Sequence, residues 1–412
     1  MKKTLLLVLI ALLVSSLFSL EYSGEFRTRY AWLHNWLGTE HEKDRFIDSR
    51  LQAQFAATPL SNLRVVWGVQ VGDLKWGDDS ETGIFSKQVN VRTQHLYADF
   101  TGIERTRIQM GLVPWNDLRS IVFDEDFAGL FFRHEFCNYV TLETGYGLLR
   151  NGDTVLHSEW YGPLSHAYSR NADNALYFVN LEYEKEVGIQ TMVNTYKYTP
   201  LRNRAYHAWA MPYLSKKFGN LYMDTVLAYN FGYIDRDSEY KNTVNHGLAF
   251  SLDLELCAGK AGKPGLNVLV ATGDNGEDPE STTYFTTISS DYTNGLEIFG
   301  NGVHSDSPQD YFFDAFNGGH GMLSVVGRYA LPLCEKMTLR FALGVVSALE
   351  EGTGIYKTEG TLMGTEVNLG VRMNLLRGLT IDVMGAYAVP GDFYGKDLDN
   401  VLGLHSKLNI NF

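Results

Sequence analysis

The chain has 412 residues and a formal net charge of −13. This acidic balance argues against nucleic acid as a partner, because contacts to phosphate backbones need a basic surface. The sequence has 24 Tyr, 23 Phe and 40 Gly but only 10 Pro, and no apolar run of about 18 residues recurs after residue 20, which excludes membrane-spanning helices. Such a mixture is typical of a membrane barrel with an apolar outside, a polar lumen and aromatic girdles.

The first residues resemble an export signal. Met1-Lys2-Lys3 is basic, residues 5–13 are apolar, and small residues follow up to Ser19. We expect residues 1–19 to be a cleaved signal peptide and residues 20–412 to form one barrel domain. A membrane anchor is the alternative, but the apolar run is shorter than the roughly 20 residues that a spanning helix needs.

After the signal, apolar and polar residues alternate with period two over nearly the whole chain. In residues 22–32 the even positions are mostly aromatic, whereas the odd ones include Arg27 and Arg29. A strand places two such sets on opposite faces, whereas a helix would scatter them. About eighteen segments show this pattern: 22–36, 46–57, 63–75, 89–100, 106–114, 128–136, 139–148, 174–185, 187–198, 203–217, 221–235, 241–258, 265–273, 319–331, 337–349, 361–375, 379–388 and 402–412.

The connections alternate between short turns and long, mostly acidic loops. Bacterial barrels thread in this way, with short periplasmic turns and longer external loops. We therefore predict an all-β, transmembrane, antiparallel up-and-down β-barrel of eighteen strands. Residues 199–202 form a short connection where an external loop is expected, which leaves sixteen strands as the alternative. The long external loop 274–318 is large enough to narrow or cap the pore, and its apolar piece 296–299 indicates that it packs on something.

The final strand alternates Leu404, Leu408 and Ile410 with polar residues and ends on Phe412. A last amphipathic strand ending in Phe resembles the assembly signal of bacterial outer-membrane barrels. We expect the barrel-assembly machinery to recognise it. A soluble β-sandwich with an apolar last strand is the alternative.

If apolar side chains face lipid, their neighbours face the lumen, because a charged group at mid-bilayer costs roughly 2–4 kcal/mol. The arginines assigned inward by this parity, and predicted to line the pore, are Arg27, Arg29, Arg50, Arg64, Arg107, Arg133, Arg328, Arg340 and Arg372. An opposite acidic arc is predicted from Glu143, Glu182, Asp224, Asp253 and Glu255. Further acids, Glu25, Asp48, Glu366 and Asp382, are interspersed among the arginines.

Two interpretations of this wall stay open. A ladder of guanidinium groups would attract anions, since these groups are always charged and present forked donors to carboxylates. The alternative is a mixed wall in which neighbouring acids neutralise the arginines. The external acidic groups Asp78-Asp79, 124–126 and 274–280 are expected to be solvated or to bind divalent ions weakly.

Enzyme signatures are missing from the sequence, including G-x-S-x-G, H-E-x-x-H, a Walker loop and C-x-x-C. We predict no enzymatic activity, no cofactor and no metal site. Cys137, Cys257 and Cys334 form no spacing motif, and an odd count leaves at least one thiol unpaired within the chain.

The first third of the chain resembles the alginate-export family of outer-membrane barrel porins. The matching pieces are Arg50-Leu51-Gln52, Trp76-Gly77-Asp78, residues 95–100, residues 107–111 and Phe127-Ala128-Gly129-Leu130. This resemblance implies an eighteen-strand passive channel with a cationic lumen for an anionic polysaccharide or a small acidic solute.

These observations together predict a porin of the bacterial outer membrane through which hydrophilic solutes, anionic ones such as acidic saccharides among them, diffuse passively. The expected partners are outer-membrane lipid, lipopolysaccharide and small hydrophilic solutes. The alternatives are a structural or adhesion barrel plugged by loop 274–318, and a barrel hydrolase whose catalytic groups come from separate strands.

Overall fold

A computed structural model describes residues 19–35, 43–76, 91–149, 174–198, 203–235, 242–275, 278, 280–300, 319–351, 358–395 and 398–412. Residues 1–18 of the expected signal peptide, the acidic pair Asp78-Asp79, the connection 199–202 and residues 301–318 of the long loop lie outside these ranges. Within these ranges, no helix has the length and apolar character needed to cross a bilayer.

Eighteen long strands make up the sheet that these residues form. They are β1 (Ser19–His34), β2 (Lys43–Leu60), β3 (Leu63–Trp76), β4 (Val91–Ile103), β5 (Thr106–Asn116), β6 (Asp124–Glu135), β7 (Val140–Leu148), β8 (Asn174–Tyr183), β9 (Val187–Tyr198), β10 (Asn203–Phe218), β11 (Leu221–Asp235), β12 (Thr243–Leu256), β13 (Lys263–Ala271), β15 (Met322–Cys334), β16 (Met337–Ser347), β17 (Leu362–Leu376), β18 (Leu379–Pro390) and β19 (Val401–Asn411). A two-residue strand, β14 (Ser281–Thr282), pairs in parallel with β12. The short 3-10 turns are η1 (Leu118–Ser120), η3 (Gly259–Ala261) and η6 (Asp392–Tyr394).

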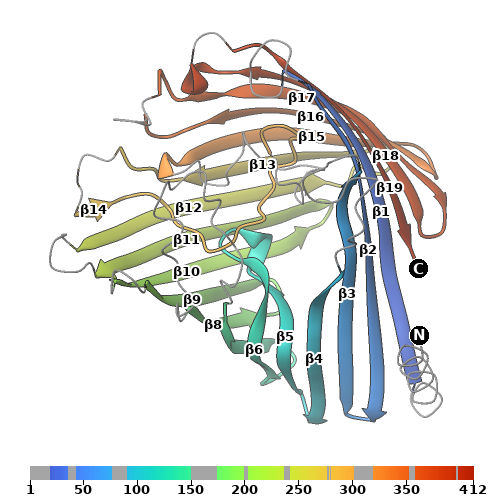
Figure 1. Ribbon diagram of the computed structural model, residues 1–412, viewed down its shortest axis with the longest axis vertical. Coiled ribbons are helices and arrows are strands. Elements are labelled where there is room, and N and C mark those ends of the chain that lie inside the picture. The colour runs from blue at the N-terminus through green and yellow to red at the C-terminus, as the bar shows by residue number, and fades with distance from the viewer. Residues whose placement is uncertain are drawn as a thin grey trace.

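Each long strand pairs antiparallel with the next, and β13 pairs with β15. The ring closes because β1 also pairs with β19, so that Glu25 lies opposite Asn411 and His34 opposite Leu402. Figure 1 shows the strands following one another around a central space, with β1 beside β19. The predicted all-β antiparallel barrel of eighteen strands is confirmed, and the alternative of sixteen is excluded.

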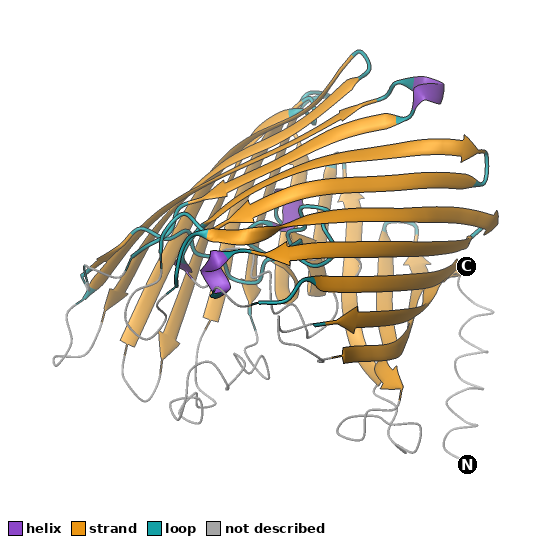
Figure 2. Cartoon of the chain, turned by 90° about the horizontal axis from the view of Figure 1, so that it is seen from above, coloured by secondary structure: helices purple, strands orange, loops and turns teal. Residues whose placement is uncertain are grey.

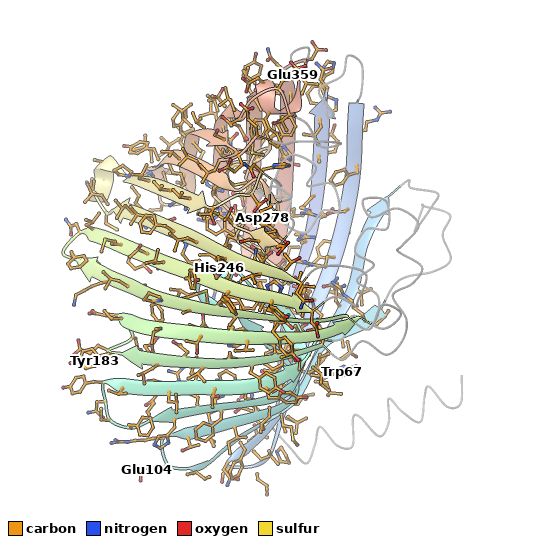
Figure 3. All side chains as sticks on the ribbon, turned by 90° about the vertical axis from the view of Figure 1, so that its left-hand side faces the viewer. Trp67, Glu104, Tyr183, His246, Asp278 and Glu359 are labelled. Carbon is orange, nitrogen blue, oxygen red and sulfur yellow. The ribbon has the colours of Figure 1, made fainter. Side chains whose placement is uncertain are left out.

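The period-two pattern gives each strand one apolar outer face and one inner face. On β17, Val367 and Leu369 are exposed, whereas Glu366 and Asn368, which alternate with them, are buried. On β12, His246 lies on the outer side (Figure 3), while its neighbour Asn245 is buried inside. Because side chains alternate strictly along a strand, the register alone decides which residues face the lumen.

The connections differ at the two ends of the barrel. At one end, eight short turns join strand pairs; in Figure 3, Glu104 lies in one of these turns and Tyr183 is the last strand residue before another. Gly219 (φ +61°) and Gly378 (φ +79°) occupy turn positions with left-handed backbone, which glycine adopts without strain. At the other end the connections are mostly longer. Two of them return into the barrel, and Figure 2 shows described loop segments inside the ring of strands.

The seam between β1 and β19 ends in a close contact between Gly24 and the C-terminal residue. Gly24 N–H donates to the Phe412 carbonyl, and Phe412 N–H donates to the Gly24 carbonyl, both at 3.0 Å. A Cβ on Gly24 would lie 2.5 Å from a Phe412 ring carbon and 2.5 Å from the Gln52 carbonyl oxygen. Because Gly24 has no side chain, the Phe412 ring and the Gln52 carbonyl can approach its backbone closely at the seam.

Gly24→Ala is expected to weaken closure by about 1–3 kcal/mol, the usual effect of overpacking a close contact. Urea unfolding of the refolded barrel in detergent micelles, followed by heat-modifiable gel mobility, measures the change. Gly385→Ala on β18 is the matched control, because its Cβ would meet only the Leu369 carbonyl oxygen at 3.8 Å. Equal stability of the two variants would contradict a closing role for Gly24.

Candidate solute channel

Part of the inner wall is apolar, whereas the sequence predicted a polar lumen. Phe127, Phe178, Met192, Trp209 and Met211 point inward from β6, β8, β9 and β10 and are almost completely buried. They are buried because two chain segments cover them from inside the barrel. We name these the first inner segment, residues 117–123, and the second inner segment, residues 283–300.

The first inner segment connects β5 to β6 and is organised around the Asp117 carboxyl group. Its oxygens accept the backbone N–H groups of Ile121 at 2.9 Å, Val122 at 2.6 Å and Phe123 at 2.6 Å. These three apolar residues are at most 1% exposed. Behind them, Trp115 stacks on Phe178 with 4.1 Å between ring centroids. The segment is thus a compact turn that presents apolar side chains to the wall.

Burial raises the pKa of Asp117 to about 7, although its three backbone donors act in the opposite direction. A carboxyl group whose pKa is higher in the folded state stabilises that state most at pH below its ordinary pKa. This contribution is lost as the pH rises through 7. We expect the open-channel current in planar bilayers to become noisier between pH 5 and pH 8.5 as the segment loosens. In Asp117→Asn, whose side chain cannot titrate, this change should disappear, and an unaltered pH profile in that variant would contradict the assignment.

The second inner segment is fixed to the wall along its length. Trp209 Nε1 donates to the Thr286 carbonyl at 2.9 Å, and the Tyr292 hydroxyl donates to Asn267 Oδ1 at 2.9 Å. Farther along, Asn294 Nδ2 donates to Ser324 Oγ at 2.8 Å. Phe285, Tyr292, Leu296, Ile298 and Phe299 are buried. The sequence did not determine whether loop 274–318 lies outside or inside the barrel. In the structure, residues 283–300 of this loop lie inside the barrel and pack on the wall.

The two inner segments are bonded to each other by backbone groups. Ile288 and Ser289 N–H donate to the Val122 carbonyl at 2.9 and 3.1 Å, and Asp291 N–H donates to the Ser120 carbonyl at 3.1 Å. Asp124 N–H in turn donates to the Ser289 carbonyl at 2.7 Å. The segments therefore form one unit inside the barrel.

Arg119 ties this unit to the barrel wall. Its guanidinium lies 3.3 Å from the Asp253 carboxylate and stands 5.6 Å over the Tyr292 ring. Arg328 approaches the same carboxylate to 2.6 Å. One wall carboxylate thus holds a cation from the first inner segment and a cation from β15.

Beside the inner segments lies a cavity of about 1110 Å³. Its lining comes from β1–β6, the end of β19 and residues 289–291 of the second inner segment. Ser23 lies near the turn end of β1, whereas Arg92 lies near the loop end of β4. The cavity therefore crosses β1–β6 as a band, and on each of these strands its lining covers at most five consecutive positions.

The lining of this cavity is polar and contains charges of both signs. Its carboxylates are Glu25, Asp124, Glu125, Asp126 and Asp291, and its basic groups are Arg50, Arg92 and His95. His95 Nδ1 lies 3.0 Å from Asp126 Oδ1, and Arg50 lies 3.8 Å from Glu25. Gln52 and Gln94, which also line the cavity, both donate to Gln70 Oε1, at 3.0 and 2.7 Å. Acidic groups outnumber guanidinium groups along this surface.

The nine arginines predicted to line the pore lie on the inner wall, and most of them are in ion pairs with wall carboxylates. The pairs are Arg29 with Asp48, Arg50 with Glu25, Arg64 with Glu21, Arg107 with Asp99, Arg133 with Glu143, Arg328 with Asp253, and both Arg340 and Arg372 with Asp382. Arg27 is 1% exposed on the same face of β1. Of the nine, Arg50 is the one found among the cavity-lining residues.

The predicted acidic arc is interleaved with cations rather than separate from them. Glu143 and Asp253 bind the arginines named above, and Glu255 lies 2.9 Å from Lys263. Glu182 accepts the Tyr213 hydroxyl at 3.1 Å, while the Asp224 backbone carbonyl is 3.5 Å from Arg119. The electrostatic role of these arginines and acids stays a prediction.

Several residues of the site escaped the sequence analysis. Residues 124–126 were expected in an external loop, yet they begin β6 and line the cavity, because the first inner segment turns inward just before them. The apolar triplet Ile121-Val122-Phe123 within that supposedly solvated loop was the signal of inward packing. Among the described residues, no group of three His, Cys, Asp or Glu side chains could hold a metal ion. Cys137, Cys257 and Cys334 are free thiols close to short turns.

Comparison with known proteins supports the fold. No family model matches the sequence, and no curated protein matches it either. Among solved structures, Pseudomonas aeruginosa OpdL is similar over 96% of this chain and 99% of its own, with a TM-score of 0.59 and 12% identity. OccK8 (OprE) gives a TM-score of 0.58 at 12% identity, covering 96% and 98% of the two chains. The outer membrane protein OprD of the same organism gives 0.54 at 13% identity, covering 95% and 94%. The chain therefore has the barrel fold of these proteins.

Proposed function

We propose that this chain is an outer-membrane channel through which small hydrophilic solutes diffuse passively. The observation that carries the proposal is the polar cavity that crosses β1–β6 inside the barrel, from near the turn end of β1 to near the loop end of β4. Polar and charged groups along such a path replace the hydration shell of a solute. Diffusion needs no catalytic group and no cofactor, and we propose that the chain is not an enzyme.

The outer face of the barrel supports the membrane location. Leu343 is 50% exposed, Leu369 56% and Met110 63%, and similar side chains recur around the ring. Exposing so much apolar surface to water is unfavourable, whereas hydrocarbon accepts it. OprD, which shares the fold, is an outer membrane protein. We infer that outer-membrane lipid and lipopolysaccharide surround this barrel, and that the barrel-assembly machinery binds the strand ending in Phe412.

Reconstitution into planar bilayers tests the proposal. We expect stepwise, ohmic current increments, because the cavity leaves a polar path beside the inner segments. The competing function is a structural or adhesion barrel whose lumen is plugged. The inward position of residues 283–300 favours this alternative because the segment occupies part of the lumen. A refolded barrel that inserts without conducting would favour the plugged barrel and contradict the channel.

Ion selectivity tests the finer assignment to an alginate-export type of channel, which predicts anion preference. The cavity lining supports the opposite sign, because its carboxylates outnumber its guanidinium groups. We expect a reversal potential in a potassium chloride gradient that reports cation preference. Arg50→Gln should raise the cation-to-anion permeability ratio by on the order of two- to threefold, the effect of one screened charge.

Arg340→Gln is the control for that measurement. Arg340 lies on the inner wall beside Asp382 but outside the cavity lining, so its loss should leave selectivity almost unchanged. Comparable shifts from Arg27, Arg50 and Arg340 substitutions, together with anion preference in the unmodified chain, would instead support the arginine ladder and an acidic solute such as a saccharide acid.

A further inference from the structure

A buried carboxylate on the barrel wall holds the second inner segment. Glu366 points inward from β17 and is 1% exposed. Its Oε1 accepts Glu297 N–H at 2.7 Å, its Oε2 accepts Phe299 N–H at 2.7 Å, and both oxygens accept Ile298 N–H at 3.0 and 3.1 Å. Three successive backbone donors thus converge on one side chain that is distant in sequence.

The wall around Glu366 is shaped to receive the same stretch of chain. Gly344 on β16 lies opposite Glu366 in the register, and a Cβ there would come within 2.8 Å of a Leu296 methyl carbon. Gly364 precedes Glu366 by two residues on the same face, and a Cβ there would come within 2.5 Å of the Phe299 ring. Leu296 and Phe299 therefore occupy space that any larger wall residue would fill. We name Gly344, Gly364 and Glu366 the wall socket.

The wall socket is connected to the cavity through the second inner segment. Residues 297–299 sit in the socket, Asn294 is bonded to Ser324, and Tyr292 to Asn267. Residues 289–291, which immediately precede Tyr292 in the chain, line the cavity. They also bond to residues 120–124, so the start of β6, which lines the cavity at residues 124–126, depends on the same attachment.

From this geometry we propose that the wall socket, with Glu366 as its positioning residue, fixes the second inner segment and thereby sets the largest solute that passes. The inference rests on the proposed channel function. Glu366 does not line the cavity, so it acts through residues 289–291 rather than by touching the solute. Hydrogen bonds from three consecutive amides to one carboxyl group hold the segment more rigidly than apolar contact alone, because they fix its direction as well as its position.

The test compares Glu366→Gln and Glu366→Ala with the unmodified chain. Liposome swelling with arabinose, sucrose and raffinose measures the size limit, and single-channel recording measures conductance. We expect Glu366→Ala to admit a larger sugar than the unmodified chain and to conduct more, with current fluctuations. Glu366→Gln, which keeps the volume but replaces one acceptor oxygen by a donor, should fall between them. Unchanged size limits and conductance in both variants would overturn the proposal.

Two further variants distinguish the role of the wall socket from the effect of removing a charge from the lumen. Gly364→Ala keeps the carboxylate but displaces the Phe299 ring, so it should widen the channel as Glu366→Ala does. Asp382→Asn, which removes another buried wall carboxylate, is the matched control because the contacts of Asp382 are to Arg340 and Arg372 rather than to an inner segment. An equal widening in Asp382→Asn would assign the effect to lost lumen charge and overturn the role of the socket.

Amide hydrogen exchange of the refolded, unmodified barrel provides a measurement that does not depend on a variant folding. The N–H groups of residues 297–299 should be strongly protected, and Glu366→Gln should speed their exchange by on the order of tenfold. Rapid exchange of these amides in the unmodified chain would overturn the socket even if the barrel conducts. Protected amides in a barrel that does not conduct would instead reject the channel function and leave the socket intact.

Discussion

A backbone N–H or C=O group that is buried away from water must be hydrogen-bonded, and this requirement governs both the wall and the interior of the barrel. In the wall the pairing of β1 with β19 satisfies it, because a closed sheet has no free edge. Inside the lumen the chain leaves the sheet, and other groups must supply acceptors. Asp117 and Glu366 do so in the same manner, each accepting three consecutive amide protons. A carboxylate is well suited to this task because its two oxygens accept several donors at once.

The inner wall shows how charge is accommodated in an enclosed space. A buried guanidinium without a partner would lose hydration without replacement, so pairing with carboxylates is favoured. Arg29 with Asp48 and Arg372 with Asp382 join adjacent strands in this way, and Arg133 with Glu143 does the same on β6 and β7. Removing one member of a buried pair is more damaging than removing both, because it leaves an isolated charge. The alternation of acids and arginines across neighbouring strands is therefore a structural property of the wall as well as an electrostatic one.

Sequence periodicity predicted the strands and favoured eighteen of them, with sixteen as the alternative because of the short connection 199–202. Each expected segment corresponds to one strand of the barrel, as 337–349 does to β16 (Met337–Ser347), and the parity of β17 placed Glu366 and Arg372 on the inner face. Boundaries shifted where a loop contributed to the sheet, as at β6, which begins at Asp124 rather than at residue 128. These errors are small because a strand's period is a local property of the chain.

The site was less predictable because it depends on contacts between distant residues. Nothing local distinguishes Glu366 from other inward acids, and its partners lie 67–69 residues away along the chain. The apolar inner face at Phe127 and Trp209 made sense only once a covering segment was known. Parity could assign arginines to the lumen, but it could not show that Arg50 lines the cavity while Arg340 does not. Pairing between side chains on different strands requires the three-dimensional register.

The cavity is lined mainly by β1–β6, whereas the inner segments pack mainly on the remaining wall. The barrel therefore has two arcs, one that borders the cavity and one that is covered by the inner segments. Substitutions on the covered wall disturb packing with the inner segments, whereas those at Gln52 or Gln94 change the polar surface of the cavity. Under the proposed channel function, selection can change which solutes pass by altering one arc of the barrel while the other arc preserves its architecture. The same separation makes the arc of β1–β6 the place where the proposed permeability could be redesigned without altering the rest of the fold.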